Sequence, residues 1–255
     1  MKLAVFSDVH GNLHALKMVK ADIEAHQPDL IWCLGDLASH GSRPSECIQL
    51  IKTWRETFGK EQFVVIGGNT DRYVVTGERF KMPPIADEGR FHQELQMRQE
   101  ADTLLNWGFS KLTWDDYQFL AEQIGRETSH YVEGYGWVIG YHAVPGDDEK
   151  FLTPASTDEE IADYLLDREG RLAIGAHIHA QMNRHVRGWQ VVNCGSVGAS
   201  FDMRGKAQWG LFTFADDVVD IQLKALDYDI EAVIQDALAV GFPLVDWLSK
   251  RLRNA

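Results

Sequence analysis

Carboxylate, amide and imidazole side chains recur where short apolar runs of this sequence end. They form five groups in chain order: Asp8 with His10, Asp36, Asn69, His142, and His177 with His179. Each group alone has an ordinary structural explanation, such as a helix cap or a turn, but five of them at strand ends favour one shared site. Oxygen ligands with neutral imidazoles suit Mn, Fe, Zn or a similar divalent ion. Seven candidate ligands suit two ions, roughly 3.5–4 Å apart and sharing a carboxylate.

The elements that would position these groups alternate between strands and helices. Strand-like apolar runs lie at 3–6, 30–34, 63–66, 137–141 and 172–174. Helix-like stretches lie between the first three runs, at about 13–25 and 44–57, with Asn12 and Ser45 as the expected N-caps. This order predicts a parallel sheet covered by helices. Functional side chains of such sheets gather at the carboxyl ends of the strands, which here carry the polar groups.

The rest of the chain adds hairpins and further helices. Turn signals near Arg187-Gly188 and Asp216-Asp217 predict two hairpins, so the sheet should be mixed. Residues 88–124 have the pattern of two helices, the second capped by Thr113, and we expect them to form an insertion beside the site.

The carboxyl-terminal segment, about 229–253, carries apolar residues at helical spacing. The spacing is broken at Gly241-Phe242-Pro243, which predicts two amphipathic helices packed on the core. No repeat or linker divides the sequence, so we expect a single domain over 1–255.

Composition and charge restrict the functions that this chain can have. Its 255 residues are 45% hydrophobic and 25% charged, as in an ordinary globular protein. The net charge of -13 disfavours nonspecific binding to nucleic acid or to an anionic membrane. Three widely spaced cysteines argue against a disulfide framework and a cysteine zinc site. No stretch approaches the ~20 apolar residues of a membrane span, and no signal peptide is recognisable, so we expect a cytoplasmic protein.

In the order of its polar groups, the sequence resembles the calcineurin-like metallophosphoesterase superfamily. The likeness rests on Asp8-x-His10, Gly35-Asp36, Gly68-Asn69, His142 and His177-x-His179. The segments GDLASHGSRPSECI and VVNCGSVG further resemble its bacterial phosphodiesterase-like branch, and residues 73–110 are covered least. The resemblance implies an α/β (α+β) fold of four layers, in which helices flank two mixed sheets, with a small helical insertion.

The resemblance also implies a division of the ligands between two ions. One ion would be held by Asp8, His10, Asp36 and His179, and the other by Asp36, Asn69, His142 and His177, with Asp36 bridging. The implied activity is phosphoester hydrolysis by attack of a metal-bridging hydroxide. Two divalent ions are the expected cofactors, with Mn favoured over Fe, Zn and Ni. A small phosphoester or nucleotide-type substrate is the expected partner, nucleic acid and membrane are not, and a homo-oligomer is left open.

One position departs from the pattern of the superfamily. Many members have a histidine after the Gly-Asn pair that helps to protonate the leaving oxygen or contacts the phosphate, and Thr70 stands there in this chain. Threonine is no general acid near neutral pH, so the leaving group must be good or another group must help. The catalytic candidates are Asp36, Asn69, Asp71, Arg72 and His40. Phosphodiesters or activated nucleotide-type substrates are therefore favoured; the alternatives are a protein or nucleotide phosphomonoesterase and a non-catalytic binding scaffold.

The backbone around the late histidines carries two expectations. Ala176 and Ala143 stand where the superfamily often has glycine, and a positive φ at either alanine would be disfavoured. An extended backbone through His177 and His179 would place both imidazoles on one side and turn Ile178 toward the core.

Overall fold

The fold is taken from a computed structural model that describes residues 1–253 of the 255. Its first half contains β1 (Lys2–Phe6), α1 (Leu13–His26), β2 (Leu30–Cys33), α2 (Pro44–Phe58), β3 (Phe63–Val65), α3 (Asn69–Thr76), α4 (Phe91–Lys111) and α5 (Trp114–Gln123). Its second half contains β4 (Thr128–Val132), β5 (Gly136–Gly140), α6 (Asp158–Tyr164), β6 (Leu172–Gly175), β7 (Gln181–Val186), β8 (Trp189–Cys194), β9 (Lys206–Ala215), β10 (Val218–Asp227), α7 (Ile230–Ala239) and α8 (Val245–Leu252). All five strand-like runs are strands; α3, β4 and α6 were not predicted. No helix within residues 1–253 has the length and apolarity that a bilayer crossing requires.

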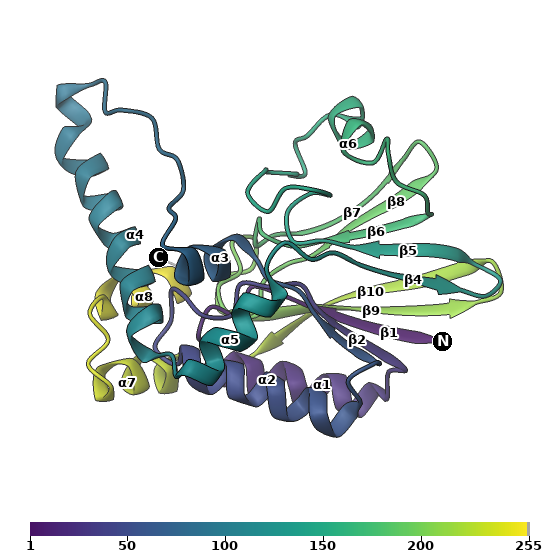
Figure 1. The fold of residues 1–255 in the computed structure, drawn as a ribbon, viewed down its shortest axis with the longest axis horizontal. Coiled ribbons are helices and arrows are strands. Elements are labelled where there is room, and N and C mark those ends of the chain that lie inside the picture. Colours follow the sequence, from purple (N-terminus) through teal and green to yellow (C-terminus); the bar gives the residue numbers. More distant parts are fainter. Residues whose placement is uncertain (254–255) are drawn as a thin grey trace.

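Two five-stranded sheets lie face to face, as Figure 1 shows. The first has the order β10-β9-β1-β2-β3, in which β1, β2 and β3 are parallel. The second has the order β4-β5-β6-β8-β7, in which β5, β6 and β8 are parallel. The two predicted hairpins are β7-β8 and β9-β10, and each supplies an antiparallel pair. The expectation of mixed sheets is therefore confirmed.

Strand β1 shows why the layers stack as they do. Leu3 and Val5 pack between the two sheets, whereas Ala4 and Phe6 pack with the apolar side chains of α1 and α2 on the opposite face. Successive side chains of a strand point to opposite faces, so a strand that is apolar throughout must be covered on both sides. A third cluster packs α6 against the second sheet. The layers are therefore helices, sheet, sheet and helix, which confirms the predicted four-layer architecture.

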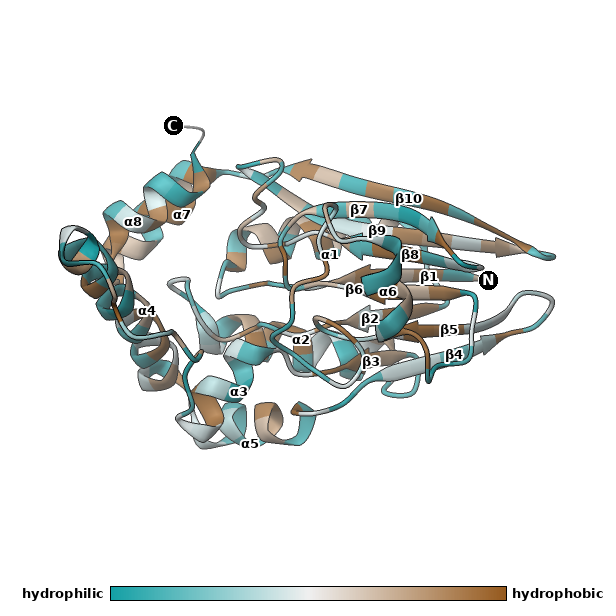
Figure 2. Cartoon of the chain, turned by 90° about the horizontal axis from the view of Figure 1, so that it is seen from above, coloured by the Kyte–Doolittle hydropathy of each residue, from teal (hydrophilic) through white to brown (hydrophobic). Residues whose placement is uncertain are grey.

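The helices outside the sandwich gather at one end of the molecule, where Figure 2 shows α4 with α7 and α8. The carboxyl-terminal half of α4 packs against both of these helices through Leu104, and α3 contacts α4 through Leu105. Thr113 caps α5, as predicted, because its side chain accepts a hydrogen bond from the Asp116 amide. Both predicted helices of the 88–124 segment and both of the 229–253 segment are present.

The two predicted N-caps of the early helices have different outcomes. The Asn12 side chain accepts a hydrogen bond from the Ala15 amide and caps α1. The prediction for Ser45 is wrong, because α2 begins one residue earlier, at Pro44. Proline at the first helical position is favoured because its fixed φ suits the helix and its missing N–H has no partner there. The Ser45 hydroxyl instead donates to Asp116 Oδ2 at 2.6 Å and ties α2 to α5.

Candidate metal centre

The predicted polar groups lie beyond the carboxyl ends of five strands from the two sheets. The pairs of strand and following residue are β1 with Asp8, β2 with Asp36, β3 with Asn69, β5 with His142 and β6 with His177. Parallel strands end at the same edge of a sheet, and stacking two such sheets brings their edges together. The topology therefore brings to one place residues that are up to 171 positions apart, from Asp8 to His179.

Six of these side chains form two groups that share one carboxylate. The candidate ligand atoms of each group lie within 4.8 Å of one another; the groups are Asp8, His10, Asp36 and His179, and Asp36, His142 and His177. Asp36 joins them because its Oδ2 lies 3.6 Å from His10 Nε2 and 3.6 Å from His142 Nε2. Two neighbouring cations need such a shared carboxylate to offset their mutual repulsion.

Asn69 extends the second group. Its Oδ1 lies 3.1 Å from His142 Nε2 and 3.1 Å from His177 Nδ1. Asn69 is the first residue of α3, so the helix start fixes where its amide points. With Asn69, the second group has the same membership that the family resemblance implies for the second ion.

Two backbone carbonyls orient the imidazoles. His142 Nδ1 lies 2.7 Å from the Leu34 carbonyl oxygen, and His179 Nδ1 lies 2.7 Å from that of Ala199. An Nδ1–H that donates to a carbonyl leaves the Nε2 lone pair directed into the group. This is the usual outer partner of a metal-binding histidine.

Several buried polar atoms of the two groups have no hydrogen-bond partner among residues 1–253. They include Asp8 Oδ1, His10 Nδ1 and His177 Nε2. Buried polar atoms are nearly always paired, so each of these needs an explanation. His10 Nε2 and His179 Nε2 also lie only 3.0 Å apart. A divalent cation would satisfy Asp8 Oδ1 and would bind facing imidazole lone pairs, so the donor set fits metal ions.

Burial and mutual proximity shift the pKa values of the site. Burial lowers the pKa of His10 well below its usual value and lowers that of His177 to about 4, which keeps both imidazoles in the neutral, metal-binding form. Burial opposes ionisation of Asp36, but His142, His10 and His177 together outweigh it and hold the pKa of that carboxyl well below its usual value. Burial also disfavours the charged form of His142, yet Asp36 raises the pKa of this histidine to about 10. A metal ion and a proton therefore compete for His142.

The backbone of the site is strained. Nine residues other than glycine have positive φ within the described part of the chain, and six of them are at the site, with φ from 47° to 70°. These six are Asp8, His10, Asp36, His40, His177 and His179. Left-handed backbone is unfavourable for side chains other than glycine and concentrates at functional sites.

The backbone through the late histidines is not extended, so that expectation was wrong. His177 and His179 have φ of 70° and 55°, and the Ile178 amide donates to the Ala176 carbonyl at 2.8 Å. The tight turn is fixed from outside, because Asp8 Oδ2 accepts the His177 amide at 3.1 Å. Ile178 is buried, as expected. Neither Ala176 nor Ala143 has positive φ, so alanine fits where the superfamily often has glycine.

Gly68 is required by the approach of two loops. A Cβ atom on Gly68 would lie 2.2 Å from Asp36 Oδ1 and 2.6 Å from His142 Cε1. Asp71 holds the same loops together, because Oδ1 accepts from the Leu37 amide at 2.8 Å and Oδ2 from the Gly68 amide at 3.1 Å. Asp71 is fully buried. These contacts make Asp71 a positioning residue, whereas the sequence had suggested it as a candidate for helping the leaving group.

Arg72 and His40 differ in their placement. The Arg72 guanidinium binds Asp148 through Nε at 2.8 Å and through Nη2 at 2.7 Å, and it also pairs with Glu149. A guanidinium with these partners is not free to bind a phosphate, so the prediction for Arg72 is not supported by its contacts. The His40 ring lies 4.8 Å from the His10 ring, at the rim of the first group. Asp71, Arg72 and His40 are the catalytic candidates that are not metal ligands. Of these, only His40 has an aromatic ring that packs against a candidate ligand, His10.

A family model for calcineurin-like phosphoesterases matches residues 1–181. The chain belongs to this family. The matched region contains all seven candidate ligands and both parallel segments that carry them. The family membership and the clustering of carboxylates and imidazoles together indicate a metal-dependent phosphoesterase.

Three solved structures and one curated relative match nearly the whole length of this chain. A hypothetical protein from Pyrococcus horikoshii matches with a TM-score of 0.79 and 18% identity, covering 100% of this chain and 99% of that one. A metallophosphoesterase from Sphaerobacter thermophilus matches with a TM-score of 0.70 and 20% identity, covering 99% and 98%. An archaeal protein described as a novel phosphodiesterase matches with a TM-score of 0.50 and 13% identity, covering 89% and 100%. An uncharacterized protein of Methanocaldococcus jannaschii is 25% identical, covering 98% of this chain and 96% of its own.

The sequence reasoning assigned no role to two residues that support the ligands. Ser196 Oγ donates to the Asp8 carbonyl at 2.9 Å, and Asn193 Nδ2 donates to the Ala176 carbonyl at 2.6 Å. Both lie in VVNCGSVG, which was noted only as a family-like segment. Phe201 was also missed; its ring stacks on His179 with 4.8 Å between centroids.

Proposed function

We propose that this phosphoesterase hydrolyses phosphodiesters or activated nucleotide-type substrates, with two divalent metal ions, for which Mn is favoured. The observation that carries the proposal is the sharing of Asp36 between two groups of ligands. The first ion would be held by Asp8, His10, Asp36 and His179, and the second by Asp36, Asn69, His142 and His177. Two such ions neutralise phosphate oxygens and acidify a water to hydroxide near neutral pH.

The charge of the ligand set suits an anionic substrate. Asp8 and Asp36 are the only carboxylates among the seven ligands, and the rest are an amide and imidazoles. Two dications and two carboxylates leave a net charge of about +2 at the site. The chain as a whole has a net charge of -13, so the site would attract a phosphate that most of the surface repels.

Thr70 is the reason to prefer diesters. Its backbone amide donates to Asp36 Oδ1 at 2.9 Å, so its function in the fold is to orient the shared carboxylate. Its hydroxyl cannot protonate a leaving alkoxide near neutral pH. His40 is the remaining candidate for contact with the leaving group. A substrate with a stable leaving group fits this site better than an unactivated alkyl monoester.

We also propose that the protein acts on a small-molecule substrate and is cytoplasmic. Cys33, Cys47 and Cys194 are all buried and unpaired, as suits a reducing compartment.

The test combines metal analysis with two substrates that release the same chromophore. Protein stripped of metal and reloaded with Mn, Zn, Fe(II) or Ni is analysed by mass spectrometry for ions per chain, and then assayed with bis(p-nitrophenyl) phosphate and p-nitrophenyl phosphate. We expect two ions per chain and a higher kcat/KM for the diester. A higher kcat/KM for the monoester would identify a phosphomonoesterase. Failure to bind or turn over with any ion would identify a non-catalytic scaffold.

A further inference from the structure

A cavity of about 470 Å³ opens beside the second ligand group. Asn69, Thr70 and His177 are among its lining residues, so a group attached to a phosphate bound at the ions lies within reach of this space. Its volume is within the range of small-molecule sites, about 300–1,000 Å³. Much of the cavity wall comes from the coil between α3 and α4 and from α4 itself.

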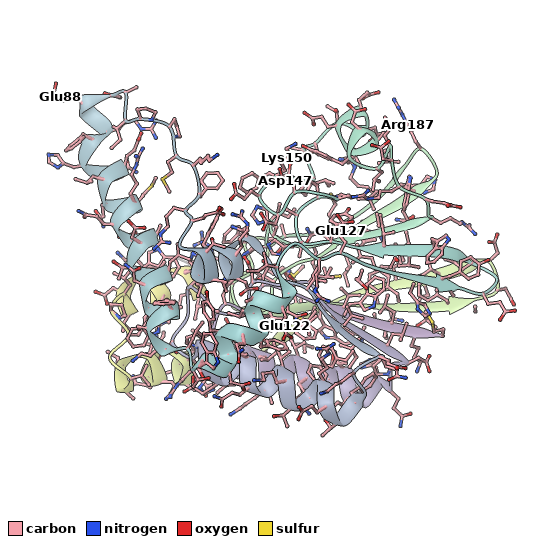
Figure 3. The ribbon with its side chains drawn as sticks, viewed as in Figure 1. Glu88, Glu122, Glu127, Asp147, Lys150 and Arg187 are labelled. Atoms are coloured by element: carbon pink, nitrogen blue, oxygen red, sulfur yellow. The ribbon has the colours of Figure 1, made fainter. Side chains whose placement is uncertain are left out.

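The walls of the cavity are mainly apolar, although Arg79, Arg98 and Asp102 also line it. Phe80 and Met82 of that coil are 43% and 39% exposed, and Phe151 of the loop between β5 and α6 is 57% exposed. The Phe151 ring lies 4.9 Å from the His177 ring, which connects the apolar wall to a candidate metal ligand. Figure 3 labels Lys150, the residue before Phe151 in the loop between β5 and α6. Exposed apolar side chains gathered around a cavity are typical of a ligand site.

The wall is held in place by two links between the coil and α4. Arg79 Nε donates to Asp102 at 2.8 Å, and Arg98 Nη2 donates to the Pro83 carbonyl at 2.5 Å. Figure 1 shows the coil running beside α4 for much of that helix. The exposed apolar side chains therefore lie on a fixed wall.

We infer that this cavity binds the organic group esterified to the phosphorus, and that this group contains a planar aromatic ring, such as a nucleobase or an aryl ring. The inference rests on the proposed function, because the ions must hold the phosphate. Phe80, Met82 and Phe151 then determine which ester is selected. An aromatic ring suits these walls because it packs on phenylalanine rings and on the thioether of methionine.

The test is a binding measurement that needs no turnover. Mn-loaded protein is titrated calorimetrically with phenylphosphonate and with methylphosphonate, whose P–C bond is not hydrolysed. We expect phenylphosphonate to bind about tenfold more tightly or better. The double variant Phe80→Ala/Met82→Ala should reduce this advantage to about twofold and leave the affinity for methylphosphonate unchanged. Phe109→Ala is the matched control, because Phe109 is 56% exposed on α4 and does not line this cavity.

Four outcomes overturn the inference. Equal binding of both phosphonates by the unaltered protein, no binding of either, or an equal effect of Phe109→Ala would each do so. The fourth concerns a second copy of the chain. If light scattering shows a dimer that Phe80→Ala/Met82→Ala converts to monomer, with the preference for phenylphosphonate intact, the wall is an interface between copies. The proposed function fails separately: phenylphosphonate preference without hydrolysis of any ester refutes the function alone, and diester hydrolysis without the preference refutes the cavity alone.

Discussion

Replacing Asp36 by asparagine should remove one of the two metal ions selectively. The substitution keeps the size of the side chain and removes one negative charge from both ligand groups. The first group then retains the carboxylate of Asp8, whereas the second retains only neutral ligands. We therefore expect the second ion to be lost and the first to be weakened.

The size of the effect can be estimated from the charges. A carboxylate and a unit positive charge about 4 Å apart interact by about 4 kcal/mol at an effective dielectric constant of about 20, and a dication interacts more strongly. About 4 kcal/mol corresponds to roughly a thousandfold in binding affinity. The second site, with no carboxylate left, should fall below detectable occupancy at micromolar metal. Diester hydrolysis should fall by a similar factor or more, because the two ions act together.

The assay is metal content per chain after dialysis, measured beside kcat for bis(p-nitrophenyl) phosphate. Asp8→Asn is the converse variant. It removes the carboxylate that belongs to the first group alone and leaves Asp36 in both groups, so each group keeps one carboxylate. Asp116→Asn controls for the loss of a buried aspartate, since Asp116 is fully buried between α2 and α5 away from the site. It should retain two ions. Two tightly bound ions and an unchanged rate in Asp36→Asn would refute the assignment of Asp36 as the bridge.

Four further predictions address the surroundings of the site. Thr70→His supplies a proton donor, so the ratio of monoester to diester kcat/KM should rise about tenfold, and an unchanged ratio would contradict the reason given for diester preference. Gly68→Ala places a methyl group 2.2 Å from the shared carboxylate, and calorimetry should show at least about tenfold weaker metal binding with the circular dichroism spectrum unchanged. Arg72→Gln should lower the free energy of unfolding in urea by about 1 kcal/mol while kcat stays within about threefold; a larger loss of kcat would restore Arg72 as a substrate-binding residue. The hydrogen bond from Arg43 lowers the pKa of Asp236 below 3.8. Asp236→Asn should therefore lower the free energy of unfolding above that pH, and this loss should shrink as the pH falls through the lowered pKa. If urea unfolding shows the same loss at neutral and acid pH, the Arg43–Asp236 pair is not the cause.

The clustering of the candidate ligands was open to prediction because it obeys a local rule. His142 directly follows an apolar run and Asp36 follows one after a single glycine, and parallel strands bring such residues to one edge. The N-cap of α2 was placed wrongly because two adjacent residues both favour a helix start, and Pro44 prevailed over Ser45. Helix α6 was missed because seven residues are too few for a helical period to be visible.

The turn at the late histidines could not be predicted from neighbouring residues, because its cause is distant in the sequence. The Asp8 carboxylate accepts the His177 amide, and Asn193 binds the Ala176 carbonyl, so the loop after β1 and strand β8 determine the local backbone. Alternating side chains of an extended segment are a sound default. It failed where contacts from other strands outweighed the intrinsic preference of histidine for negative φ.

The two proposals assign metal binding and substrate selection to different parts of the chain. The candidate ligands follow the carboxyl ends of strands from both sheets, where Gly68 and Asp71 leave little room for change. Much of the cavity wall comes from the coil and helix between α3 and α5; Leu105 of this helix packs on α3, whereas Phe80 of the coil is exposed. Substitutions in the wall should therefore alter which ester binds without altering metal content, whereas substitutions at Gly68 should alter both. A chain in which wall variants lost their metal would show that the two parts are not independent.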